Sequence, residues 1–475
     1  MLVEVPVNWH WILSLICRVI TVQISYRLVF GVALSLLVSG GVARAQHAIA
    51  DVIATAKHGD LEALRDVVAA GADVTVVSPD GATALLWASY RDDIEMAGWL
   101  LSVNAPVNTA NDLGVTPLWA ASENRSAQMV ALLLENGADP NLALLSGETA
   151  VMIAARAGSE AVVRLLANAG ADLDRSATRG QTALMWAAAN HHAATVKALL
   201  EHGADEHRRS AVWSQMMAVP PHSRTKRDIP HGGNTALMFA ARVGDVLSAQ
   251  HLVVAGANVD DVDAWGMSAT TIAAHGGYTK LVDVLLKHGA DPNAAVAGVA
   301  PIHNAVMRND DEMVAALLAH GANPNITLET WTPTRRASRD LHYPAAFVGA
   351  TPLWLAARFA RVDIMRLLVD HGADPQFVHE TEYIADGVYE ARTERTTTLM
   401  AALAMGGGSR FRPWVPYTDS GTAESRTLAA VTLLADHGVD INAADLVGQT
   451  VLDEAEAKQY ESVVTLLLER GAGNP

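Results

Sequence analysis

The sequence has almost no cysteine and few aromatic residues. Its single cysteine among 475 residues is Cys17, and aromatic residues make up 5% of the chain. Beyond the N-terminal segment that holds Cys17, this composition excludes disulfides, thiolate metal sites and a cysteine nucleophile. Half of the residues are nevertheless hydrophobic, which favours a core of Ala, Leu and Val between short, closely packed helices.

Positive charge is also in short supply. The formal net charge is −17, from 34 basic and 51 acidic residues. A strongly negative surface repels phosphate backbones, so we expect no nucleic-acid partner.

Recognisable catalytic and metal-binding motifs are missing. The chain has no G-x-S-x-G nucleophile elbow, no phosphate-binding loop and no H-E-x-x-H motif. The glycine-rich stretch at 406–410 lacks the Lys-Ser/Thr pair that a phosphate loop needs. Neither His191 with His192 nor His222 with His231 has metal-ligand spacing to an acid or a thiol. We therefore expect no enzymatic activity, no cofactor and no metal site.

The N-terminal segment has the parts of an export signal. Residues 28–42 form an uncharged apolar run, which follows Arg18 and Arg27 and precedes an A-x-A site that ends at Ala45. This order is typical of a secretory signal peptide, and the run is shorter than the roughly 20 residues that span a bilayer. We expect residues 1–45 to be removed, the mature chain to be periplasmic or secreted, and no stable membrane insertion to remain. An uncleaved anchor is the alternative.

One sequence motif recurs along most of the remaining chain. Its form is G-x-T-P/A-L…A-A…LL…GADxN, and the glycines at 81, 114, 147 and 180 are each 33 residues apart, as are those at 233 and 266. A fixed period of this length predicts stacked supersecondary units in place of one closed core. Thr or Ser after the glycine, and Pro at the next position in some copies, predict the start of a helix.

This pattern resembles the ankyrin repeat from about residue 47 to the end of the chain. The resemblance implies an all-α solenoid of helix-turn-helix repeats joined by β-hairpin-like turns, with first helices and hairpins on a concave face. We predict about eleven units in a domain over residues 46–475: an N-terminal cap at 47–80, repeats that begin at 81, 114, 147, 180, 233, 266, 298, 349 and 395, and a C-terminal cap at 448–475.

Four interruptions of the period define insertions at about 206–231, 327–348, 376–396 and 406–426. Insertions in repeat arrays map to loops on one face, often the face that binds. These four are rich in aromatic and basic residues, the types enriched in interface hot spots. The aromatic residues predicted to contact a partner are Trp213, Trp331, Tyr343, Trp414 and Tyr417. The alternative is that the insertions pack their aromatic side chains against neighbouring repeats.

A second set of candidates lies at the ends of the predicted first helices, where side chains should face the concave side. These positions hold Tyr90, Arg91, Arg156, Arg242, His275, Arg308 and Arg358. Recurring arginine in an acidic protein would form a basic stripe suited to an acidic or carboxylate-rich ligand. Because surface positions are often charged, an ordinary solvated face is the alternative.

Histidines in two recurring positions are interpreted as structural. One group precedes the closing glycine of each second helix, where an imidazole can bond the last carbonyl groups: His202, His288, His320, His371 and His437. His303 occupies the histidine position of the T-P-L-H motif.

Together these observations predict an exported, non-catalytic, monomeric scaffold that binds a protein partner through its concave face and insertions. Rigid display of that surface would limit the ordering cost of binding. The competing hypothesis is an enzyme or small-molecule binder whose pocket the insertions form over the concave groove.

Overall fold

The computed structural model describes residues 52–219, 222–331, 343–384, 391–407, 413–417 and 420–473. The expected signal segment, 1–45, lies outside the described residues. The chain divides into two compact units, one up to Asp112 and one from Leu113 onward, which are described in turn.

The N-terminal unit consists of short helices that begin at polar caps. Residues 52–58 are helical, and α3 (Leu61–Ala69), α4 (Ala84–Arg91) and α5 (Ile94–Ser102) follow. The side chain of Thr83 accepts a hydrogen bond from the backbone N–H of Leu86, which satisfies one of the free donors of the first turn of α4.

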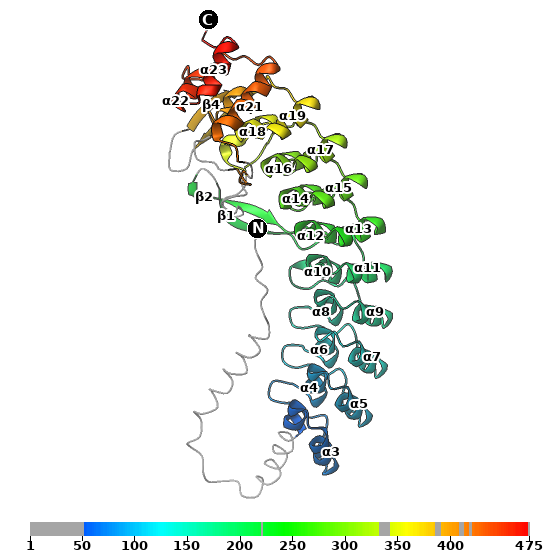
Figure 1. Cartoon of the computed structure of the whole chain (residues 1–475). Helices are drawn as coiled ribbons and strands as arrows, with labels where there is room; N and C mark the ends of the chain where they lie inside the picture. Colours follow the sequence, from blue (N-terminus) through cyan, green and yellow to red (C-terminus); the bar gives the residue numbers. More distant parts are fainter. Residues whose placement is uncertain are drawn as a thin grey trace, which may run out of the picture. The chain divides into compact units, whose positions relative to one another are not determined.

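The C-terminal unit is a solenoid of helix pairs (Figure 1), as the sequence predicts. The first helices of the pairs are α6 (Pro117–Glu123), α8 (Ala150–Ala157), α10 (Ala183–Ala189), α12 (Ala236–Val243), α14 (Ala269–Gly276), α16 (Pro301–Met307), α18 (Pro352–Arg358), α20 (Thr398–Ala402) and α22 (Val451–Ala457). The second helices are α7 (Ala127–Glu135), α9 (Glu160–Asn168), α11 (Ala193–Glu201), α13 (Val246–Ala255), α15 (Thr279–Lys287), α17 (Asp311–Ala319), α19 (Val362–Asp370), α21 (Ala423–Asp436) and α23 (Glu461–Glu469). Two 3₁₀ turns, η2 (Thr178–Gly180) and η3 (Ala345–Phe347), lie in the connections.

Each helix of this unit packs mainly on its own pair and on its counterpart in the next pair. First helices contact first helices from α6 to α20, and second helices contact second helices from α7 to α23. The buried faces are built from small and aliphatic residues, for example Ala154, Leu184 and Leu285. This nearest-neighbour packing is the arrangement that a repeat array uses in place of a single core.

The histidines behave as the sequence predicts. In His202, His288, His320, His371 and His437, the ring Nδ1 lies 2.8 to 3.0 Å from the carbonyl oxygen four residues earlier, at the end of a second helix. His303 is buried, its Nδ1 accepts from the N–H of Ala300 at 3.1 Å, and its Nε2 lies 3.0 Å from the carbonyl oxygen of Ile326. The structural interpretation of these residues is confirmed.

Asparagine side chains join successive repeats on the side of the turns. Asn293 donates to the carbonyl oxygen of Gly321 and accepts from the N–H of Asn323. Asn325 makes the same two bonds to Gly372 and Asp374, although an insertion lies between them. These bonds hold neighbouring repeats in register.

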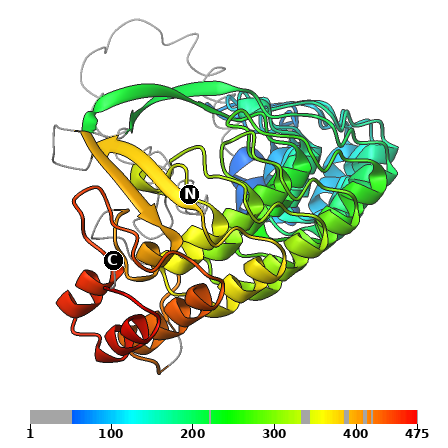
Figure 2. The ribbon, with the colours of Figure 1, turned by 90° about the horizontal axis from the view of Figure 1, so that it is seen from above.

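The insertions contain two antiparallel hairpins, which extend from the side of the first helices (Figures 1 and 2). One pairs β1 (Trp213–Val219) with β2 (His222–His231), with Trp213 opposite His231. The other pairs β3 (Val378–Ile384) with β4 (Ala391–Thr397). Burial alternates along β3, so its inward residues His379, Thr381 and Tyr383 pack on the array while its other face is open.

The fourth insertion separates the two helices of one pair, α20 and α21. Helix α21 has 14 residues, whereas its neighbour α19 has nine. It begins at Ala423, so the end expected for this insertion, residue 426, lies inside the helix.

Candidate functional site

The candidate site is the first-helix face, defined here as the surface of the C-terminal unit formed by the ends of the first helices and by the insertions. Arg156, at the end of α8, is half-buried, and its guanidinium group lies 5.0 Å from the ring centroid of Trp186 on α10. Arg242, at the end of α12, is exposed and donates to the side chain of Asn234 at 2.9 Å. These two predicted positions are open at the surface.

The two candidates of the N-terminal unit are also exposed. Tyr90 is 39% exposed and makes an edge contact with the ring of Trp87. Arg91 packs over Gly59, where an added Cβ would come within 2.6 Å of its guanidinium nitrogen. Both therefore remain candidates for contact with a partner at the surface of the N-terminal unit.

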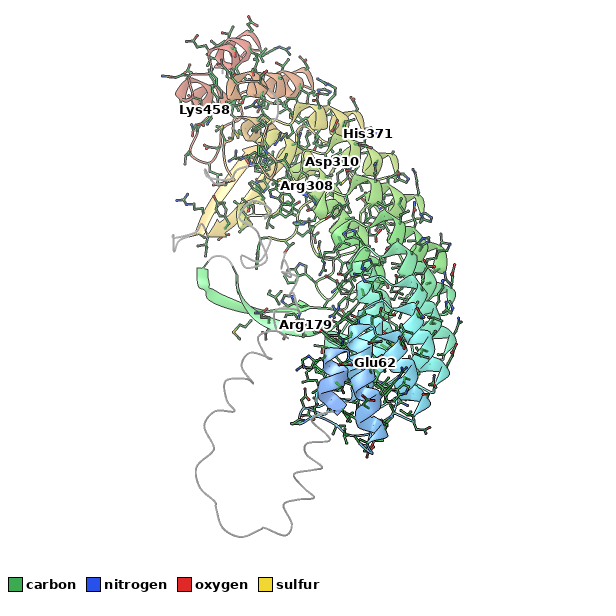
Figure 3. All side chains as sticks on the ribbon, turned by 60° about the horizontal axis from the view of Figure 1, so that its bottom comes forward. Glu62, Arg179, Arg308, Asp310, His371 and Lys458 are labelled. Carbon is green, nitrogen blue, oxygen red and sulfur yellow. The ribbon has the colours of Figure 1, made fainter. Side chains whose placement is uncertain are left out.

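The β1–β2 hairpin carries a cation on an aromatic stack. The ring of Trp213 stacks on that of His231 with centroids 4.3 Å apart, and the guanidinium group of Arg179 lies 5.4 Å from the Trp213 centroid. Figure 3 shows Arg179 beside this hairpin. The guanidinium group of Arg242 likewise lies 6.0 Å from the ring centroid of Phe239. Arg156, Arg179 and Arg242 therefore place positive charge next to aromatic rings along consecutive repeats, which is a favourable arrangement for each cation.

The first two insertions meet each other. Trp331 packs with Trp265 against the buried side chain of Ile229 on β2. This apolar contact anchors the base of the hairpin to the segment that follows α17. Trp331 is half-buried and so retains some open surface.

The second and fourth insertions meet in an aromatic cluster over α14 and α16. The ring of Trp414 lies 4.9 Å from that of Tyr343 and 5.4 Å from that of His275. Tyr343 donates its hydroxyl to the side chain of Asn304 at 2.9 Å. Tyr343 and Trp414 are only 3% and 7% exposed. These two side chains therefore order the insertions, as the packing alternative expects, and do not present open contact surface.

Burial also affects Arg308 and its neighbour Tyr343. Arg308 donates to the carbonyl oxygen of Gly276 at 2.5 Å, and burial lowers its pKa from the usual arginine value. Burial raises the pKa of Tyr343 well above that of an ordinary tyrosine, and the charge of Arg308 opposes this shift.

Arg358 is not the exposed contact that its position predicts. It is 8% exposed, because β4 and the loop after α20 cover it. Burial lowers its pKa, while the carboxylate of Glu394 on β4 favours its charged form. Glu394 in turn accepts from the hydroxyl of Tyr383 and from the N–H of Gly407, each at 2.5 Å. Arg358 thus belongs to a covered polar network.

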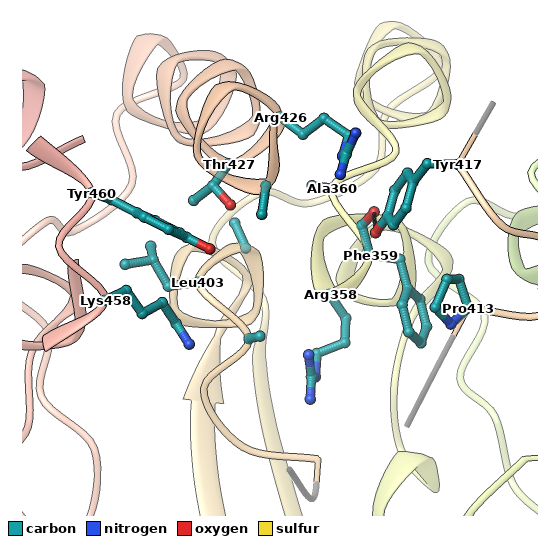
Figure 4. A pocket seen from close by; sticks show the side chains of 13 residues that line it. Arg358, Phe359, Ala360, Leu403, Pro413, Tyr417, Arg426, Thr427, Lys458 and Tyr460 are labelled. Carbon is teal, nitrogen blue, oxygen red and sulfur yellow. Dashed lines mark hydrogen bonds between the residues drawn. The ribbon is translucent and has the colours of Figure 1, made fainter. Parts of the chain in front are cut away.

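A pocket of about 190 Å³ opens beside this network, between the ends of α18, α20 and α22 and the start of α21 (Figure 4). It is lined by Arg358, Phe359, Ala360, Ala402, Leu403, Ala404, Pro413, Tyr417, Ala423, Arg426, Thr427, Lys458 and Tyr460. Three of these side chains are cationic. The lining within the described part of the chain contains no Asp or Glu.

Tyr417 links the fourth insertion to the pocket wall. Its ring lies between two guanidinium groups, with Arg426 at 3.9 Å and Arg361 at 4.2 Å from the centroid. Its hydroxyl donates to the carbonyl oxygen of Phe359 at 2.7 Å. The ring and the hydroxyl group of Tyr417 therefore both hold the insertion against the end of α18.

The sequence interpretation missed Arg426, Lys458 and Tyr460. Lys458 and Tyr460 belong to the last repeat, whose polar residues are expected of a terminal cap. Arg426 stands at the end of an insertion, and only the extended start of α21 shows that it lines the same pocket as Lys458 and Tyr460.

The described residues contain neither a cluster of metal ligands nor a membrane-spanning helix. No cluster of three or more His, Cys, Asp or Glu side chains suited to a metal ion occurs in this part of the chain. Likewise, no helix within the described ranges has the length and hydrophobicity needed to cross a membrane.

Comparison with known proteins identifies the family. The family model described as "Ankyrin repeats (3 copies)" matches residues 52–143, 140–210, 237–328 and 295–379, which is more than half of the chain. The chain therefore belongs to the ankyrin-repeat family. Ankyrin repeats generally mediate protein–protein interaction, and their fold is typically non-catalytic.

The individual relatives match only parts of their own length. The mitochondrial disaggregase of Bos taurus is 32% identical over 175 residues, which cover 34% of this chain and 22% of the relative. The inactive serine/threonine-protein kinase TEX14 is 43% identical over 63 residues in Bos taurus and 39% over 66 residues in Mus musculus, or 4% and 5% of those proteins. Among solved structures, the human ASB11 ankyrin repeat domain is 27% identical with a TM-score of 0.42, and the match covers 51% of this chain and 98% of that one.

Proposed function

We propose that this chain is an exported, monomeric, non-catalytic scaffold that binds one protein partner across the first-helix face. The observation that carries the proposal is the set of cations laid beside aromatic rings on that face, at Arg156, Arg179 and Arg242. Arginine and large aromatic residues dominate interface hot spots, and the net charge of −17 of the whole chain selects against nucleic acid.

Export is the second part of the proposal. It is supported by the apolar run at 28–42 and the A-x-A site that ends at Ala45. N-terminal sequencing of the exported protein should give a mature chain that begins at Gln46. A mature start before residue 28 would contradict this part.

This pocket is smaller than the small-molecule alternative requires. Ligand pockets usually measure roughly 300 to 1,000 Å³, whereas this one measures about 190 Å³. Its described lining comes from repeat ends and from the fourth insertion, and the second and third insertions contribute nothing to it. A pocket of this size suits one side chain of a partner better than a whole substrate.

Charge reversal on the face tests the binding proposal. The double variant Arg156→Glu and Arg242→Glu should lose most of the partner in affinity capture from the native envelope fraction, measured by quantitative mass spectrometry. The matched control reverses Lys287 and Arg366, which lie on second helices and are exposed. Equal capture by both double variants, or no reproducible protein partner for the unaltered chain, would overturn the proposal.

A further inference from the structure

The pocket lies where the fourth insertion interrupts a repeat. In the preceding repeat only residues 359–361 separate α18 from α19, whereas residues 403–422 separate α20 from α21. Pro413 and Tyr417 of the longer connection line the opening, and α21 starts early enough for Ala423, Arg426 and Thr427 to line it as well. The site is therefore specific to this interruption of the repeat.

The lining concentrates positive charge in an acidic protein. Arg358, Arg426 and Lys458 all reach the pocket, and the charged ends of Arg358 and Lys458 point to the same side of it (Figure 4). Two carboxylates interact with these cations. Glu454 forms an ion pair of 2.9 Å with Lys458, and the charge of Glu394 favours the charged form of Arg358. The described lining includes the three cations and neither of these carboxylates, although the guanidinium group of Arg426 also stacks on Tyr417 and donates to the carbonyl oxygen of Gly421.

The remaining residues of the pocket lining suit the other atoms of an acidic side chain. The hydroxyl groups of Thr427 and Tyr460 add polar contacts beside the cations, while Phe359, Leu403 and Pro413 supply apolar walls. The pocket, of about 190 Å³, has room for one carboxylate side chain with its methylene stem.

We propose that this pocket anchors the carboxylate of a glutamate or aspartate side chain in an acidic segment of the partner. The inference rests on the proposed function, because it assumes that a polypeptide lies along the first-helix face. Guanidinium groups bind carboxylates with two parallel hydrogen bonds, and such anchors in small pockets give an interface its register.

Blocked peptides provide the test. The probe is an acetylated and amidated decapeptide of alternating Gly and Glu, compared with the same peptide carrying Gln, by isothermal titration at low salt. The Glu peptide should bind at least tenfold more tightly. A Gln peptide with a free C-terminus separates side-chain recognition from capture of a terminal carboxylate, and preferential binding of that peptide would overturn the proposal.

Variants of the full chain assign the binding to the pocket. Arg426→Gln with Lys458→Gln should weaken binding of the Glu peptide about fivefold or more, whereas Arg366→Gln with Lys287→Gln should leave it unchanged. Tyr460→Phe removes only a hydroxyl group and should weaken binding measurably, which keeps the test valid if loss of Arg426 disturbs the stack on Tyr417. Equal binding by all variants would exclude the pocket. Capture of a partner that depends on Arg156 and Arg242 would in that case still support the scaffold function.

Discussion

The carboxylate of Glu394 on β4 accepts a hydrogen bond of 2.5 Å from the backbone N–H of Gly407, in the loop that follows α20. The other oxygen of the same carboxylate accepts from Tyr383 on β3, also at 2.5 Å. One side chain therefore ties the β3–β4 hairpin to the connection that leads into the pocket, directly over Arg358.

Replacing Glu394 with Gln should loosen this connection. The variant keeps the shape of the side chain but removes the charge that opposes Arg358 and weakens two charge-assisted bonds. Bonds of this kind contribute about 1.5 to 3 kcal/mol, so we expect the free energy of unfolding to fall by about 2 kcal/mol. Urea unfolding and amide exchange at Gly407 measure the effect. Glu382→Gln, at an exposed position of β3, is the matched control and should have little effect.

The buried His303 should make stability depend on pH. Burial lowers its pKa from 6.5 to about 4, so the folded chain holds it neutral while the unfolded chain protonates it below about pH 6.5. The unfolded state then binds more protons between these values, and stability falls as the pH decreases from 6.5 toward 4. With a pKa difference of this size, the loss at pH 5 is about 2 kcal/mol.

Urea unfolding at pH 7.5 and pH 5 tests this dependence. His303→Asn should lose stability at pH 7.5, but its further loss on moving to pH 5 should be about 2 kcal/mol smaller than for the unaltered chain. His288→Asn, at an exposed helix end, should keep the full difference. The same pH difference in both variants would show that His303 is not the source.

Gly232 should resist substitution much more strongly than Gly203. Both have a positive φ, of 84° and 87°, so alanine adds backbone strain at either position, about 1 to 2 kcal/mol. At Gly232 an added Cβ would lie 1.9 Å from the carbonyl oxygen of Ala211, whereas at Gly203 it meets nothing within 4 Å. Gly232→Ala must therefore shift the base of the β1–β2 hairpin, at an extra cost of about 2 kcal/mol.

Limited proteolysis reads out this difference. Trypsin should cleave at the basic residues of β2 much faster in Gly232→Ala than in Gly203→Ala, and thermal unfolding should show the larger loss for the first variant. Equal cleavage rates in the two variants would contradict the predicted displacement of the hairpin.

Trp414→Ala should destabilise the aromatic cluster of the insertions. Removing a buried tryptophan costs about 3 to 5 kcal/mol, because Tyr343 and His275 lose the ring that packs between them. The proton resonances of His275 should shift as the neighbouring ring current disappears, and chemical denaturation should report the loss of stability. Arg242→Ala, at an exposed position, should stay within about 0.5 kcal/mol of the unaltered chain.

The features that depend on local sequence could be predicted. Helix starts at threonine, histidine caps such as His288 and the structural role of His303 depend on residues within a few positions of one another, or on the next repeat. The helical ankyrin-repeat solenoid follows from the same short-range pattern.

The burial of a side chain that is covered by a distant part of the chain could not be predicted from the sequence. Arg156 and Arg358 occupy equivalent places at the ends of first helices, yet Arg156 is half-buried and Arg358 nearly fully buried, because a hairpin and the Gly406-Gly407 loop lie only over the second. The contact of Trp331 with Ile229 likewise joins two insertions whose meeting has no signature in spacing. The residues that are open for contact at the site could therefore be identified only from the three-dimensional structure.

The asparagine bonds between repeats have a consequence for how this protein could be remodelled. Asn325 bonds to Gly372 and Asp374 across a repeat that carries an insertion, with the same two bonds that Asn293 makes across an uninterrupted repeat. The same pair of bonds between repeats thus forms whether or not an insertion lies between its partners. We therefore expect that an insertion can be shortened, exchanged or grafted elsewhere while the spacing of the surrounding repeats is conserved. The insertions could then be engineered separately from the repeats that carry them.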